Sequence, residues 1–197
     1  MLRRTALLTL AAPLLLAACA RDGTPSFKAV DISGADYGRD FPLPDADGRM
    51  RSIKDFRGKA VVVFFGYTQC PDVCPTTMSE IEAAKKLLGP DGARVEGVFI
   101  TIDPERDKPE MLKAYVSNFG PDMLALRGSM QQTQDVAKEF KVFYRKAPGS
   151  APGEYSMEHS AASYVFDPSG KLRLYVRYGG GAQALADDLK VLLQQQA

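Results

Sequence analysis

Two cysteines separated by three residues carry the clearest chemical signal in this chain of 197 residues. Cys70 and Cys74 lie in the stretch "FFGYTQCPDVCP", which begins at the end of an apolar run. Such a pair can form a structural disulfide, act as a redox couple or clamp a metal ion. The disulfide is the weakest of these explanations, because closing so short a segment removes little chain entropy. The pair therefore points to redox chemistry or metal binding.

His159 is the only histidine of the chain and comes just before a segment, 160–167, with the pattern of a strand. Two thiolates and one imidazole form a soft donor set that suits Cu(I) and is tolerated by Cu(II) or Zn(II). A structural zinc site normally has four protein ligands, whereas these three residues leave one coordination position open. An open position favours a site that passes its metal on.

Cys74 and two residues near this set, Asp103 and Met157, carry further expectations. Cys74 is expected at a helix N-terminus, where the helix dipole lowers the pKa of a thiol. The carboxylate of Asp103 would orient His159 or tune the cysteines, or would only form a turn with Pro104. Met157 lies two residues from His159, but the seven methionines are scattered and core packing explains them better.

Apolar patterning predicts the elements that position these residues. Continuous apolar runs at 60–66 and 94–103 predict strands covered on both faces of a sheet. Apolar residues at three- and four-residue spacing predict a helix after each of these strands, a third helix capped by Ser129, and a final helix near residue 190. Short strands are expected in "MLALRG" and "KVFYRK", a loop over 147–156, and two closing strands joined by the turn "PSG".

This order of elements indicates an α/β fold, a thioredoxin-like three-layer sandwich. The turn signal Asp47-Gly48 between short alternating segments adds an N-terminal β-hairpin. A flavodoxin-like sheet is the alternative, but the closing antiparallel hairpin argues against it. Ligands of such sheets bind beyond the carboxyl ends of the strands, so the two cysteines and Asp103 are expected at one edge. His159 joins them if its strand runs antiparallel to the central pair.

The first 18 residues have the pattern of a lipoprotein signal peptide. A basic "MLRR" precedes the apolar stretch "TALLTLAAPLLLAA", which is too short to span a bilayer comfortably. The stretch ends in "LAAC", which resembles a bacterial lipoprotein cleavage site with Cys19 as the acylated residue. An ordinary signal peptide with a coincidental cysteine is the alternative. Lipidation of Cys19 would attach the protein to a membrane and leave Cys70 and Cys74 as a pair.

Three longer stretches resemble the Sco/SenC family of thioredoxin-fold copper proteins, which assist cytochrome c oxidase assembly. They are "FPLPDADGRMRSIKDFRGKAVVVFFGYTQCPDVCPTTMSEI", "TIDPERDKPEMLKAY" and "EHSAASYVFDPSGKL", in the family's order. The combination of CPDVCP, DPERD and a downstream histidine is specific, whereas CxxxC alone is not. The resemblance implies one copper ion per domain, held by Cys70, Cys74 and His159, with Asp103 in the family's acidic strand-end position.

The same resemblance implies a copper chaperone for the binuclear copper A centre of cytochrome c oxidase, with the copper-bearing oxidase subunit as partner. The alternative is a thiol–disulfide oxidoreductase that uses Cys70 and Cys74 to reduce the cysteines of that centre. General oxidoreductases of this fold use CxxC and a facing cis-proline, whereas this chain has CxxxC and no proline just before His159. A redox or copper sensor is a third interpretation. Other copper carriers and a thioredoxin-like reductant are further partners that the resemblance implies.

The expected organisation is a signal peptide over 1–18, a lipid-anchored tether over 19–39 and a thioredoxin-like copper-binding domain over 40–197. A composition of 45% hydrophobic and 25% charged residues is that of a globular protein. The net charge of +1 offers no electrostatic basis for binding nucleic acid. The expected location is the bacterial cell envelope, on the periplasmic face of a membrane.

Overall fold

The computed structural model describes residues 26–149 and 153–195 of the chain. The predicted signal peptide and the predicted lipidation site, Cys19, lie outside these residues. None of the helices formed by the described residues is long and apolar enough to cross a membrane.

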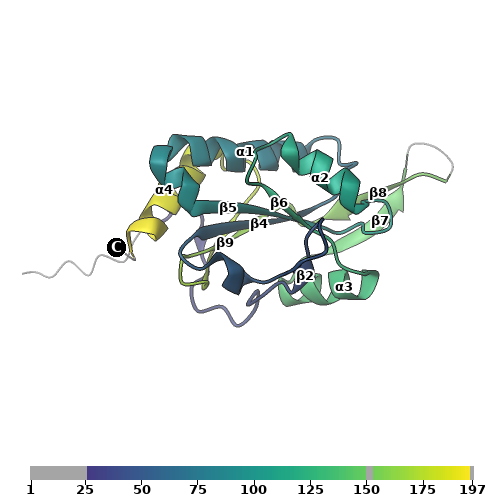
Figure 1. The fold of residues 1–197 in the computed structure, drawn as a ribbon, viewed down its shortest axis with the longest axis horizontal. Coiled ribbons are helices and arrows are strands. Elements are labelled where there is room, and N and C mark those ends of the chain that lie inside the picture. Colours follow the sequence, from purple (N-terminus) through teal and green to yellow (C-terminus); the bar gives the residue numbers. More distant parts are fainter. Residues whose placement is uncertain (1–25, 150–152, 196–197) are drawn as a thin grey trace, which may run out of the picture.

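A six-stranded mixed sheet forms the centre of the molecule (Figure 1). Its central pair is parallel and completely buried, as the two apolar runs predict. The strand order is β1-β10-β9-β4-β5-β6, and β9 runs antiparallel to β4. This mixed direction confirms the thioredoxin-like sandwich and excludes the flavodoxin-like alternative. The strands are β1 (Val30–Asp31), β4 (Ala60–Gly66), β5 (Val95–Thr101), β6 (Leu124–Leu126), β9 (Ser163–Phe166) and β10 (Leu172–Val176).

Helices cover both faces of this sheet, with α3 on the face opposite α1 and α2 (Figure 1). Ser129 caps α3 as predicted, since its hydroxyl accepts from the amide of Gln132 and the Gln132 side chain accepts in return. Helix α1 starts at Val73, so Cys74 lies in its first turn, at the helix N-terminus as expected. The helices are α1 (Val73–Leu87), α2 (Pro109–Ser117), α3 (Met130–Glu139) and α4 (Ala182–Gln194), with short 3-10 helices at Ile53–Phe56 and Gly89–Arg94.

The predicted N-terminal hairpin is present. Strands β2 (Leu43–Pro44) and β3 (Met50–Arg51) pair around the expected turn. Gly48 adopts a φ of +81°, which glycine tolerates without strain. The Asp45 carboxylate accepts from two amides of the turn, so the turn carries its own hydrogen bonds.

A second hairpin was not predicted. Strands β7 (Tyr144–Pro148) and β8 (Tyr155–His159) form a separate two-stranded sheet, so the loop expected over 147–156 is shorter than predicted. His159 therefore ends β8, and the strand expected over 160–167 begins only at Ser163. The glycine and proline residues of the stretch between β7 and β8 favoured a loop over a strand in the sequence pattern. Met157 on β8 is buried in the core, as its packing interpretation requires.

The described part of the predicted tether packs against the domain. Strand β1 pairs with β10, and the amides of Lys28 and Ala29 donate to the buried Asp188 carboxylate at 2.7 and 2.8 Å. This attachment depends on backbone hydrogen bonds to a distant helix, which leave no apolar pattern in the segment itself. The folded domain therefore begins before the predicted boundary at residue 40.

Candidate metal centre

The cysteine pair lies at the carboxyl end of β4, where the chain turns into α1. Cys70 is half-buried in the connecting loop, and Cys74 is completely buried in the first turn of α1. A Cβ atom on Gly66 would lie 2.9 Å from the Cys74 sulfur and 2.8 Å from the Phe99 ring. A glycine at the end of β4 is therefore needed for the sulfur to pack against the sheet.

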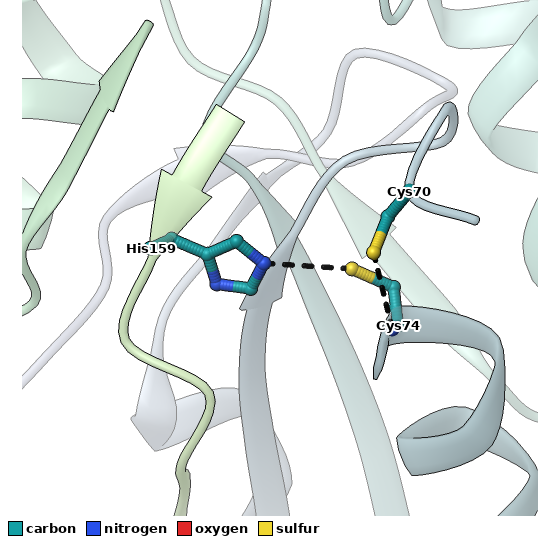
Figure 2. A group of neighbouring side chains, drawn as sticks. All are labelled: Cys70, Cys74 and His159. Atoms are coloured by element: carbon teal, nitrogen blue, oxygen red, sulfur yellow. Dashed lines mark hydrogen bonds between the residues drawn. The ribbon is translucent and has the colours of Figure 1, made fainter. Parts of the chain in front are cut away.

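His159 reaches the same edge from β8. Its ring packs edge-on against Phe64 and Tyr67, with centroids 6.0 and 6.1 Å away. Its Nδ1 lies 2.9 Å from the carbonyl oxygen of Ser160, which can only accept, so Nδ1 carries the proton. The unprotonated Nε2 then faces the Cys74 sulfur at 3.7 Å (Figure 2). The backbone thus fixes the tautomer that a metal ligand requires.

The three side chains point toward one another (Figure 2). The sulfurs of Cys70 and Cys74 and one ring nitrogen of His159 all lie within 4.8 Å of one another. In zinc sites, sulfur lies about 2.3 Å and nitrogen about 2.0 Å from the ion, so two ligands of one ion are up to roughly 4.6 Å apart. The residues therefore fit one soft metal ion after a shift of a few tenths of an ångström. The predicted trio is brought together from two distant parts of the chain.

The two thiols differ in their acidity. The Cys74 thiol and its backbone amide both donate to Cys70, which lowers the pKa of Cys70 to about 4 despite partial burial. The same thiol pairing and deeper burial raise the pKa of Cys74. The expectation that the helix terminus would favour a Cys74 thiolate is therefore wrong. The sulfur of Cys74 is enclosed, while its amide stabilises the neighbouring thiolate.

Asp103 takes partners other than the metal-centre residues. Its buried carboxylate accepts from the Arg106 guanidinium and from the Tyr155 hydroxyl, the latter at 2.9 Å. Its carbonyl accepts from the amides of Arg106 and Asp107, which forms a turn. Asp103 was expected to orient the His159 ring, but the Ser160 carbonyl does so instead. The structure thus gives Asp103 the turn-forming role, with a contact to the strand that carries the histidine.

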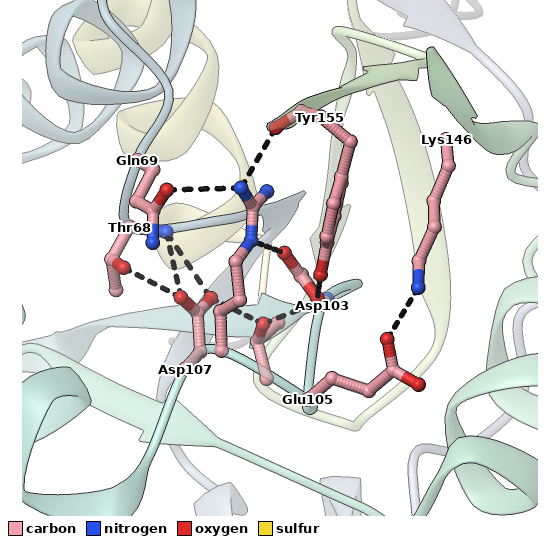
Figure 3. Close-up of polar contacts among 9 residues, drawn as sticks. Thr68, Gln69, Asp103, Glu105, Asp107, Lys146 and Tyr155 are labelled. Atoms are coloured by element: carbon pink, nitrogen blue, oxygen red, sulfur yellow. Dashed lines mark hydrogen bonds and ion pairs between the residues drawn. The ribbon is translucent and has the colours of Figure 1, made fainter. Parts of the chain in front are cut away.

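Two residues of the same DPERD segment were missed as site residues. The buried Asp107 accepts from the Thr68 amide and hydroxyl and from the Thr101 hydroxyl, which holds the loop before Cys70 (Figure 3). Burial raises the pKa of Asp107. Arg106 contacts both the cysteine loop and β8. The motif itself was the signal that could have found them, because charged residues at a strand's carboxyl end face the site.

The fold and the cluster together define a class, a thioredoxin-like domain with a two-thiol, one-imidazole metal centre at the carboxyl edge of its sheet. The chain belongs to the SCO1/SenC family, whose model matches residues 30–194.

Relatives of known name support this membership. The human mitochondrial protein SCO2 homolog is 36% identical over 153 residues, which cover 77% of this chain and 58% of the relative. A SCO2-like protein of Rickettsia prowazekii is 37% identical over 135 residues, covering 68% and 66%. The chain thus spans less than two thirds of the length of these relatives.

Solved structures are similar over almost their whole length. Copper-bound ScoI of Bradyrhizobium japonicum has a TM-score of 0.70 and 36% identity, covering 78% of this chain and 97% of that structure. The apo Sco1 protein of Thermus thermophilus has a TM-score of 0.75 and 35% identity, covering 85% and 97%. Both comparisons place the same fold around the candidate metal centre.

Proposed function

We propose that this protein binds one copper ion through Cys70, Cys74 and His159 and delivers it to the binuclear copper A centre of cytochrome c oxidase. The observation that carries the proposal is the convergence of two sulfurs and an imidazole nitrogen within 4.8 Å. This donor set selects copper, because thiolates favour Cu(I) and the imidazole accommodates Cu(II). A similar ScoI of Bradyrhizobium japonicum has been solved with copper bound.

Three protein ligands leave one coordination position for a ligand of the partner. A cysteine of the oxidase subunit that receives copper would enter this position. Copper then passes by ligand exchange and is never free in solution. Cys70 and His159 are both partly buried, whereas Cys74 is enclosed, so ligand exchange can start only at one of the two outer ligands. We therefore propose that the Cys74–copper bond is the last of the three to break during transfer.

Copper titration of the reduced protein tests the site. We expect one copper ion per domain and its near loss in Cys70→Ser and in Cys74→Ser, because one thiolate holds the ion poorly. His159→Ala should weaken Cu(II) more than Cu(I), since two thiolates satisfy Cu(I) in near-linear geometry. The measurements are bound copper and the thiolate-to-copper absorption band.

Met157→Leu is the matched control for this titration. Met157 is a buried sulfur-containing residue on the same strand as His159, and leucine preserves its packing. We expect this variant to bind one copper ion normally, whether as Cu(I) or as Cu(II). An unchanged absorption band and normal Cu(II) binding in His159→Ala would remove His159 from the metal centre.

Thiol–disulfide exchange is a second candidate function, favoured by the low pKa of Cys70, about 4. The Cys70 thiolate would attack a disulfide of the partner, forming a mixed disulfide and releasing one partner thiolate. Cys74, once deprotonated, would attack the Cys70 sulfur and release the second partner thiolate. The product is a Cys70–Cys74 disulfide, which a thioredoxin-like dithiol must reduce again. This function does not use His159, so His159 separates the two candidates.

Attachment to the periplasmic face of a bacterial membrane is part of the proposal. We propose that acylated Cys19 anchors the protein and that the residues between Cys19 and the folded domain form the tether. A structure of a SCO1/SenC family lipoprotein from Bacillus anthracis, 26% identical to this chain, offers a precedent. The distribution of a Cys19→Ser protein between membrane and soluble fractions measures this attachment.

A further inference from the structure

Three segments that build the metal centre meet on one guanidinium group. Arg106 belongs to the segment after β5, Gln69 directly precedes Cys70, and Tyr155 begins the strand that ends in His159. Gln69, Asp103 and Tyr155, which are labelled in Figure 3, each accept a hydrogen bond from this group. The cysteines and the histidine are thus joined through a residue that is not itself a ligand.

Arg106 makes this connection with a single nitrogen. Its Nη1 donates to the side-chain oxygen of Gln69 at 2.9 Å and to the backbone carbonyl of Tyr155 at 2.7 Å. Its Nε donates to the Asp103 carboxylate, which also accepts from the Tyr155 hydroxyl. The guanidinium stacks on the Tyr155 ring, 3.6 Å from its centroid. These contacts hold the group in one orientation, because the buried carboxylate and the ring leave it no other.

We propose that Arg106 is a positioning residue that sets the separation between the cysteine loop and His159, and thereby the strength of Cu(II) binding relative to Cu(I). This inference rests on the proposed copper function. Arg106 acts on the cysteines through Gln69 and on the histidine through Tyr155.

Both arms of the connection are stiff enough to transmit position. On the cysteine side, Gln69 adjoins Cys70, and the preceding Thr68 is held by the buried Asp107. On the histidine side, every residue of β8 pairs with β7, so Tyr155 and His159 move as one ladder. Tyr155 and His159 are four residues apart on this strand, which is about 13 Å at 3.3 Å per residue. A shift of the paired strand at Tyr155 therefore also moves the imidazole.

A second connection between the same loop and hairpin is weaker. Lys146 on β7 forms an ion pair with Glu105, and these side chains are 48% and 50% exposed. Exposed ion pairs contribute little, because water screens both charges. This pair also makes no contact with the cysteine loop among the hydrogen bonds of residues 26–149 and 153–195. Glu105→Gln is therefore a matched control on the same segment.

Arg106→Lys is the test variant. Lysine keeps the positive charge beside Asp103, but a single ammonium on a flexible stem cannot stack on Tyr155 and reproduce the planar fork. Loss of a residue that orients a metal ligand typically weakens binding by about 10- to 100-fold. We expect a loss of this size for Cu(II), with a shifted thiolate-to-copper absorption band, and much less for Cu(I). Arg173→Lys controls for general destabilisation, because it alters a similarly buried ion pair between Arg173 on β10 and Asp167, which directly follows β9.

A double-mutant cycle with Gln69→Ala identifies the route. If Arg106 acts on the cysteines through Gln69, the effects of Arg106→Lys and Gln69→Ala on Cu(II) affinity will not add. Full additivity would assign the Arg106 effect to another contact and overturn this arm of the proposal. Cu(II) affinity in Arg106→Lys equal to that in the Glu105→Gln and Arg173→Lys proteins would overturn the proposal as a whole.

The metal-free protein supplies an independent readout. Backbone amide relaxation dispersion in the reduced protein should show new microsecond-to-millisecond exchange at Cys70 and His159 in Arg106→Lys and none in Glu105→Gln. If the parent protein bound no copper, the proposed function would be wrong. The dispersion measurement would still decide whether Arg106 connects the cysteine loop with β8. Unchanged dispersion at both residues would show that Arg106 does not position them.

Discussion

Cys70 and Cys74 are chemically unlike, although they belong to one motif. Cys70 accepts hydrogen bonds from the amide and thiol of Cys74 and is therefore the thiolate of the pair. Cys74 lies against the end of β4 and keeps its proton, because burial disfavours its ionised form. A metal ion would therefore bind the Cys70 thiolate first. It would then displace the proton of the Cys74 thiol.

The pH dependence of alkylation measures this difference. In the reduced, metal-free protein, reaction of Cys70 with iodoacetamide should be half-maximal near the pKa of about 4 and decline below it as the thiolate is protonated. In Cys74→Ala the thiol donor is lost, so the midpoint should rise toward the ordinary cysteine value of about 8.5. Mass spectrometry gives the modified residue, and circular dichroism verifies the fold at each pH.

An alkylation midpoint that did not move in Cys74→Ala would contradict this assignment. The Cys70 thiolate would then owe its stability to the backbone amides of the helix terminus. Rapid alkylation of Cys74 at neutral pH in the parent protein would also contradict it, since the structure encloses that sulfur.

Two elements without a sequence signal complete the domain. Strand β8 positions His159, and β1 closes the edge of the sheet beside β10. Each is short and is held by partners outside its own segment. Strand β1 pairs with β10, and the residues just before it are held by α4, because the Asp188 carboxylate, which is 2% exposed, accepts from the amides of Lys28 and Ala29. The N-terminal segment is therefore part of the folding unit.

Replacement of Asp188 tests the attachment of β1. Asp188→Ala leaves two amides without their acceptor, which should lower the free energy of unfolding by about 1–3 kcal/mol. Asp187→Ala is the neighbouring control, because that exposed carboxylate accepts from Gln183 on the same helix rather than from the segment before β1. A change within about 0.5 kcal/mol is expected for it. Urea denaturation measures both, and equal unfolding free energies for the two variants would show that β1 is not held by Asp188.

At the scale of the whole molecule, the sheet edge brings a donor set to the surface through two partly buried residues, Cys70 and His159. That arrangement suits the transfer of an ion to a second protein better than permanent storage, because ligands near the surface are open to exchange. Both proposed functions use Cys70 and Cys74. They differ in whether His159 is needed afterwards.

Complementation at low copper separates these functions. Cells that lack the protein should assemble cytochrome c oxidase poorly at low copper, and added copper should partly restore assembly. His159→Ala, with both thiols intact, should fail to complement, whereas Met157→Leu should succeed. Oxidase activity and bound copper in the membrane are the readouts. Full complementation by His159→Ala, together with failure of Cys70→Ser and Cys74→Ser, would favour the reductase over the chaperone.

Sequence patterns by themselves determined the central elements and the membership of the metal centre. The strand over 60–66, the helix after the cysteines and the Ser129 cap depend on neighbouring residues, whose spacing and side-chain chemistry are visible in one dimension. The CPDVC segment with a later histidine identified three ligands for the same reason, since each is a residue type that soft metals prefer.

Only the tertiary structure decided how these residues are held. Cys74 and His159 are 85 residues apart, and the contact from Arg106 to Tyr155 spans 49 residues. The attachment of β1 and the position of His159 beside Cys74 depend on such distant partners, whereas β8 pairs with the neighbouring β7 and the Cys70 thiolate is stabilised mainly by Cys74, four residues away. A segment's own pattern reports which face is apolar, but a hydrogen bond or a buried environment exists only once the other segment is in place.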